Sequence, residues 1–120
     1  MRFPLQEDRG SAEETLEVEH ADGRTERMRI HEYERVFAVP GLYEEVVQHR
    51  LACRAPGIVA ELMAAGADAL GWDRGDVRVL DLGAGNGVSG EALAAVGLRP
   101  VAGVDILPAA RDAALRDRPG

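Results

Sequence analysis

Two acidic residues and a run of alternating glycines are the residues of this sequence whose types and spacing suit a ligand-binding site. The run reads Asp81-Leu82-Gly83-Ala84-Gly85-Asn86-Gly87, and Asp105 stands 20 positions after Gly85. A short apolar segment precedes the run and a segment with helical spacing follows it, so the glycines are expected to turn a strand into a helix. The start of a helix offers unpaired N–H groups, and glycines allow a ligand close to the backbone. The run therefore predicts a ligand-binding loop.

The elements around this run predict the beginning of a parallel α/β sheet. Residues 77–82 (VRVLDL) and 100–105 (PVAGVD) have the apolar character of strands, the first of them buried on both faces. Helical spacing follows each strand, over 88–96 and again from Pro108, which gives a β-α-β-α order with a right-handed crossover. Asp105 is then expected beside the glycines at the carboxyl edge of the sheet, where it can accept hydrogen bonds from both hydroxyls of a ribose.

The preceding part of the chain is expected to be a flexible tail over residues 1–14 and a lead-in over 15–72. Residues 15–20 and 25–30 alternate around Asp22-Gly23, which predicts a β-hairpin. Helical spacing follows over 31–38, 42–53 and 56–70. In the last of these, one apolar face is marked by Ile58, Val59, Leu62, Met63 and Leu70. Residues 73–120 then form the start of the ligand-binding domain.

Two classes of ligand fit the glycine run. Residues 85–90 match G-x-G-x-x-G with an acid 20 positions on, a pattern found in nicotinamide and flavin dinucleotide sites. Gly83, Gly85 and Gly87, however, form G-x-G-x-G directly after the strand, and Asp81 ends that strand. A fixed carboxylate there would repel a pyrophosphate and attract a ligand that carries an ammonium and a sulfonium. A ligand that carries an ammonium and a sulfonium is therefore favoured over a dinucleotide.

The stretch VLDLGAGNG, with GVD at the end of the next strand, resembles the first two motifs of the class I S-adenosylmethionine-dependent methyltransferases. The resemblance implies a Rossmann-like methyltransferase fold, S-adenosyl-L-methionine as cofactor, and methyl transfer to an unidentified acceptor. It implies that Asp81 lies near the methionine moiety, Asp105 binds the ribose and Ile106 lies against adenine. The backbone beneath the cofactor would come from Gly83, Ala84, Gly85, Asn86 and Gly87. An aromatic residue of the lead-in often covers the cofactor in this family, although Tyr33, Phe37 and Tyr43 are read first as core.

The resemblance covers residues 77–107, which supply only the first two strands of the family's larger sheet. The later motifs carry most acceptor-site residues, so no catalytic base is assigned here. We therefore expect the chain to be the amino-terminal portion of a longer enzyme and to be inactive alone. A fragment of an NAD(P)- or flavin-dependent oxidoreductase and a non-catalytic binding domain remain the alternatives.

The composition of the chain favours some classes of binding partner and one cellular compartment over others. There are 21 acidic and 14 basic residues, for a net charge of −7, which argues against a nucleic-acid partner and favours a small-molecule acceptor over a macromolecule. The sequence has neither a signal peptide nor the roughly 20 apolar residues of a membrane span. The single Cys53 excludes an internal disulfide and is expected to be buried, and a reduced cytoplasmic location follows. His20, His31 and His49 lack metal-ligand spacing, so no metal site is expected.

Overall fold

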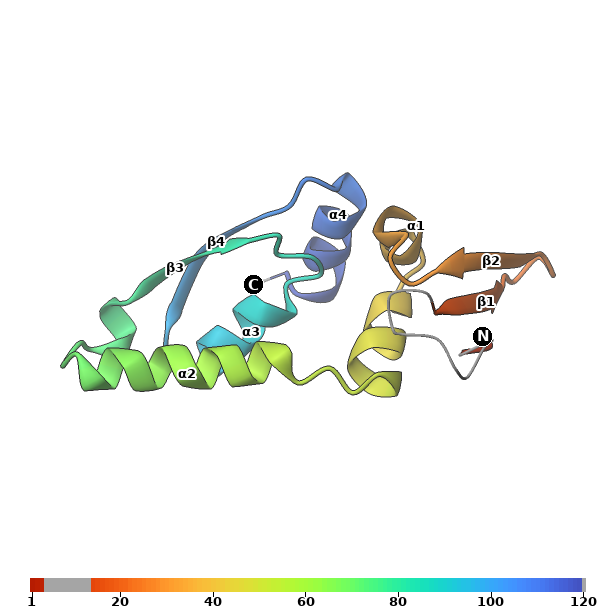
Figure 1. The fold of residues 1–120 in the computed structure, drawn as a ribbon. Helices are drawn as coiled ribbons and strands as arrows, with labels where there is room; N and C mark the ends of the chain where they lie inside the picture. Colours follow the sequence, from red (N-terminus) through yellow and green to blue (C-terminus); the bar gives the residue numbers. More distant parts are fainter. Residues whose placement is uncertain (4–13, 120) are drawn as a thin grey trace.

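A computed structural model describes residues 1–3 and 14–119 of the chain. It is a mixed α/β structure in which an antiparallel hairpin and a parallel strand pair form two separate sheets (Figure 1). The lead-in contains β1 (Thr15–Glu19), β2 (Thr25–Arg29), α1 (Tyr33–Ala38), the π-helix η1 (Glu44–Arg50) and α2 (Ala55–Ala69). The second part contains the 3₁₀ helix η2 (Arg74–Asp76), β3 (Arg78–Leu82), α3 (Val88–Ala95), β4 (Arg99–Val104) and α4 (Pro108–Asp117). None of the described helices is long and apolar enough to cross a bilayer.

The predicted hairpin is confirmed. β1 and β2 pair antiparallel from Thr15↔Arg29 to Glu19↔Thr25, and Gly23 takes the positive φ of 82° that the turn requires. The inward side chains of the hairpin join α1 and η1 in one buried cluster, and its members are Leu16, Val18, Met28, Ile30, Val36, Leu42 and Val46. Two strands alone are marginal in water, so this cluster supplies the packing that the hairpin needs.

Residues 1–3 and 14 of the predicted tail are described. Arg2 forms an isolated antiparallel bridge with Glu17, and Phe3 packs against the hairpin cluster. Residues 4–13 lie outside the described residues. The beginning of the chain is therefore paired with β1.

The helix expected over 42–53 forms with a wider turn. Its backbone is π-helical over Glu44–Arg50, and the Leu51 N–H donates to the Val46 carbonyl over 2.8 Å. Val46 is a member of the hairpin cluster, and its neighbour Val47 packs against it. The segment ends at Ala52, whose φ is 49°, and Cys53 is exposed. The predicted burial of Cys53 is thus wrong, because the residue lies in the link beyond the helix end.

Helix α2 has the predicted extent, but its apolar face is not the buried one. The buried residues are Ala60, Ala64 and Ala67. All five residues of the predicted face are exposed, with Leu62 at 68%. α2 lies beside α3 (Figure 1), and Ala60 clusters there with Leu93 and Leu98. Small side chains allow two helices to approach closely, so packing against α3 overrides the hydrophobic pattern.

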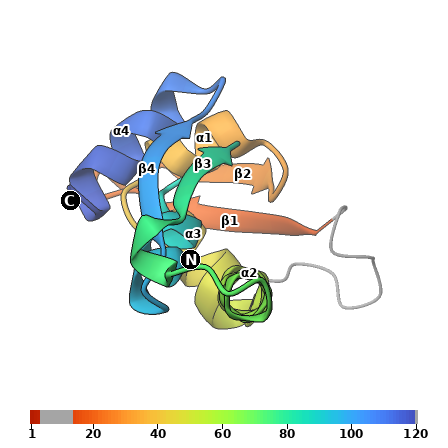
Figure 2. The ribbon, with the colours of Figure 1, turned by 90° about the vertical axis from the view of Figure 1, so that its left-hand side faces the viewer.

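The parallel strand pair is confirmed, whereas the predicted burial of its first strand on both faces is wrong. β3 and β4 pair in parallel from Arg78↔Arg99 to Leu82↔Val104, with one bulge between Val79 and Leu80. Val79 packs into the cluster that α2 and α3 share. The opposite face exposes Leu80, Leu82 and Val104, because the helices of the described residues that pack on this pair cover the other side (Figure 2).

The orientation of α2 can be tested with one substitution on each face. Ala60→Leu should lower the free energy of unfolding by about 1–3 kcal/mol, because the added methylenes overpack the contact with α3. Leu62→Ala removes an exposed side chain and should change that free energy by less than about 0.5 kcal/mol. Urea unfolding of both variants measures the two effects. A large loss for Leu62→Ala and a neutral Ala60→Leu would show that the apolar face packs inward.

Candidate functional site

The glycine run forms the loop that joins β3 to α3. Gly83, Gly85 and Gly87 have φ values of 72°, 55° and 83°, so all three occupy the left-handed region that side chains disfavour. The N–H groups of Gly83 and Ala84 donate to the Val104 carbonyl over 2.8 and 3.0 Å. The predicted strand-to-helix loop is confirmed, and it turns across the end of β4 before α3 begins.

Gly103 allows this crossing, a role that the sequence analysis did not assign to it. A Cβ atom at Gly103 would lie 2.9 Å from the Cβ of Ala84, which is too close for two carbon atoms. The loop can cross β4 at this height only because residue 103 has no side chain. The signal was present in the sequence as the glycine that precedes Val104 and Asp105.

Asp105 lies beside the loop, where its position after the second strand predicts it. Its Oδ2 atom accepts the N–H of Gly85 at 2.9 Å, and its Oδ1 atom accepts the N–H of Leu107 at 2.9 Å. The N-cap residue of α4 is Leu107, so Asp105 is not the helix cap. Each carboxylate oxygen has a second lone-pair direction, so two further hydrogen bonds from a ligand are chemically available.

Asp81 shares this edge of the sheet with Asp105. Its Oδ2 atom is buried and has no hydrogen-bond partner among the described residues. Burial raises the pKa of the Asp81 carboxyl above its ordinary value, and the neighbouring charge of Asp105 raises it further. An unpaired buried acceptor costs folding free energy, which a donor from a ligand would recover. Asp81 therefore keeps a buried acceptor atom that no described residue satisfies.

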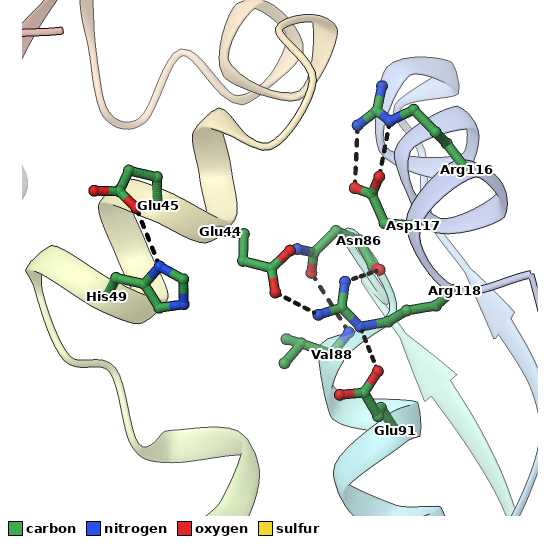
Figure 3. A network of polar contacts seen from close by, with 9 residues as sticks. All are labelled: Glu44, Glu45, His49, Asn86, Val88, Glu91, Arg116, Asp117 and Arg118. Atoms are coloured by element: carbon green, nitrogen blue, oxygen red, sulfur yellow. Dashed lines mark hydrogen bonds and ion pairs between the residues drawn. The ribbon is translucent and has the colours of Figure 1, made fainter.

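The carboxyl terminus of α4 braces the loop through Arg118 (Figure 3). Its Nη1 atom donates to the Asn86 carbonyl at 3.3 Å, and its Nη2 atom donates to Glu44 of η1 at 3.1 Å. Its Nε atom lies 3.0 Å from Glu91 of α3, and the Arg118 side chain is only 13% exposed. Sequence reasoning missed the contacts of Arg118 with Glu44 and Glu91, because no local pattern links an arginine to carboxylates on distant elements.

Asn86 is held inside this arrangement. The residue is 2% exposed, and its Oδ1 atom accepts the N–H of Val88 at 3.4 Å. The side chain thus turns back onto the first residue of α3. The Asn86 side-chain amide is therefore enclosed and does not face solvent.

One of the three lead-in aromatic residues reaches the glycine loop. A Cβ atom at Gly85 would lie 3.3 Å from Cζ of Phe37. Phe37 is buried, stacks on Tyr43 with a centroid distance of 4.5 Å, and packs on α4. Tyr33 is 40% exposed at the edge of this aromatic group. Phe37 is therefore both a core residue and the cover of the loop.

Ile106 follows Asp105 and is 94% exposed. Its side chain lies on the surface next to the site, where a flat apolar ring could cover it. An open hollow of about 400 Å³ lies close by, between the start of α1 and Leu107. The motif resemblance implies that Ile106 lies against adenine, and that contact stays a prediction.

Comparisons of the chain with protein-family models, with curated proteins and with solved structures find no match. The assignment of a function therefore depends on the geometry of the site and on the motif resemblance.

The charge of Asp81 should lower the stability of the protein at neutral pH. Because the folded-state pKa is raised above the ordinary value of 3.8, the folded protein holds this proton more tightly than the unfolded chain. Stability from this group is then greatest at low pH and is lost as the pH rises through the folded pKa. We expect Asp81→Asn to melt at a higher temperature than the parent at neutral pH, with a smaller difference near pH 3.8.

Thermal melts at the two pH values measure this effect, and Asp76→Asn is the matched control. Asp76 is an exposed acid at the end of η2, before β3 begins, so its removal reports the general benefit of one less negative charge. An Asp81→Asn melting temperature no higher than that of the control at neutral pH would show that the buried oxygen has a stabilising partner.

Proposed function

We propose that this chain is the cofactor-binding portion of an S-adenosylmethionine-dependent methyltransferase with a Rossmann-like fold. One observation carries the proposal. Two carboxylates, Asp81 and Asp105, stand together at the carboxyl ends of two parallel strands, beside a loop of left-handed glycines. Open α/β sheets bind ligands at this edge.

The residues present fit the charge of this cofactor. The unpaired Oδ2 atom of Asp81 suits the ammonium group of the methionine moiety. The free lone pairs of Asp105 suit the two ribose hydroxyls, and exposed Ile106 offers an apolar contact for adenine. The backbone under the cofactor would come from Gly83, Ala84, Gly85, Asn86 and Gly87. The three glycines have no side chains that would keep the cofactor away from the backbone.

When bound, S-adenosylmethionine supplies an electrophilic methyl group on a sulfonium. The described residues would bind and orient it, and orientation of the two reactants can supply roughly 7–11 kcal/mol of the barrier. Net negative charge favours a small-molecule acceptor, and the single cysteine favours the reduced cytoplasm as its compartment.

A dinucleotide is the second candidate, because residues 85–90 match its glycine pattern. The electrostatics of the site argue against it. A pyrophosphate at the start of α3 would face Asp81, whose buried oxygen already lacks a donor, and Asp105 beside it. Like charges at short distance repel strongly where water is excluded. The site therefore favours a ligand whose polar end is positive.

The role of Asp105 can be tested by calorimetry with S-adenosylhomocysteine. Asp105→Ala should weaken binding by about 10- to 100-fold, since a hydrogen bond to a charged group is worth about 1.5–3 kcal/mol. Asp105→Asn should weaken it less, because one oxygen acceptor remains.

An analogue without either ribose hydroxyl separates ligand contacts from loop support. Asp105 also accepts the Gly85 N–H, so its removal could loosen the loop itself. If the ribose contact is the cause, the parent and Asp105→Ala should bind the analogue with nearly equal affinity. An equal loss for both ligands would assign Asp105 to loop support alone, and NADH binding tighter than S-adenosylhomocysteine would favour the dinucleotide.

A further inference from the structure

The lead-in lies on the glycine loop in a way that fills the space a ligand would need. The ring of Phe37 occupies the direction in which a side chain at Gly85 would project, with Cζ 3.3 Å from that Cβ position. The ring is only 5% exposed and is fixed between Tyr43 and the alanines of α4. The loop is therefore covered at its central glycine.

The same loop is tied to η1 by charge. Arg118 donates to the Asn86 carbonyl of the loop and to Glu44 of η1, and it also pairs with Glu91 (Figure 3). Glu44 is the lead-in residue of this network, and it joins the loop only through the guanidinium. One ion pair thus helps to hold η1 against the glycine loop.

The N–H of the central glycine also has a partner within the protein. The Gly85 N–H, which a ligand would otherwise meet, donates to Asp105 at 2.9 Å. A ligand that lies over Gly85 has to share the space with the Phe37 ring, and close-packed interiors leave no room for both. Binding over Gly85 thus requires the ring to move.

We propose that α1 and η1 form a cap that competes with the cofactor for the glycine loop, and that cofactor binding requires Phe37 to leave Gly85. This inference rests on the proposed function, and it adds that the lead-in restrains the site. The affinity of a site that is open for a fraction of the time is reduced by that fraction. Weakening the cap therefore increases the apparent affinity, whereas an aromatic wall that contacts the ligand would have the opposite effect.

Three variants of the full chain test the cap with S-adenosylhomocysteine as the probe. Glu44→Ala removes the ion pair to Arg118 and should tighten binding about two- to fivefold, the range of a partly exposed ion pair. Phe37→Leu shortens the side chain that reaches Gly85 and should tighten binding about tenfold, provided the variant folds. Glu45→Ala is the matched control, because the partners of Glu45 among the described residues are His49 (Figure 3) and Arg50, both within η1.

Calorimetry measures the affinities, and hydrogen exchange of residues 83–88 without ligand reports the cap directly. We expect faster exchange in these amides for Glu44→Ala and Phe37→Leu, and an unchanged rate for Glu45→Ala. Unchanged exchange in the first two variants would overturn the cap.

The affinities distinguish the two proposals. A parent that binds the probe, with Glu44→Ala and Phe37→Leu equal or weaker, would overturn the cap and leave the proposed function intact. Binding by these two variants alone would support both proposals. Failure of the parent and all three variants to bind would overturn the proposed function. It would also overturn the proposed competition between the cap and the cofactor.

Discussion

The carboxylate of Asp105 is the interaction on which the arrangement of the site depends. It accepts one N–H from the glycine loop and one from the turn before α4, so a single side chain fixes the end of β4 to both. A charged acceptor forms stronger hydrogen bonds than a neutral one. The two helices that follow the strands are thereby set relative to each other by the group that we propose binds the ribose.

This arrangement places negative charges together at a cost. Asp81 lies in the field of Asp105, with a buried oxygen that no described residue satisfies. Strained or unsatisfied groups persist where they serve a ligand, and a protein without its ligand is then less stable than its packing would allow. Elsewhere around the loop, Phe37 lies against Gly85, and Arg118 at the end of α4 pairs with Glu44 and Glu91.

The sequence predicted what depends on local pattern. The hairpin came from Asp22-Gly23, and the strand–loop–helix order came from the glycines and the apolar runs. The sequence did not predict the features that tertiary packing determines. Helix α2 turns its alanines inward because α3 lies there, and the first parallel strand keeps one face exposed. The partners of Arg118 were beyond prediction, since Glu44 lies 74 positions away and no spacing rule links them.

The bulge in the parallel pair has a consequence for how such sites are searched for. β4 uses six residues to pair with the five of β3, so Asp81 stands opposite Gly103 and Asp105 falls one position later than an unbroken ladder would put it. The separation of 20 between Gly85 and Asp105 therefore includes a residue that contributes no strand length. Spacing in sequence and height on the sheet are different quantities. A motif defined by a fixed spacing would miss a chain without the bulge, even where its acid stood at the same height beside the loop.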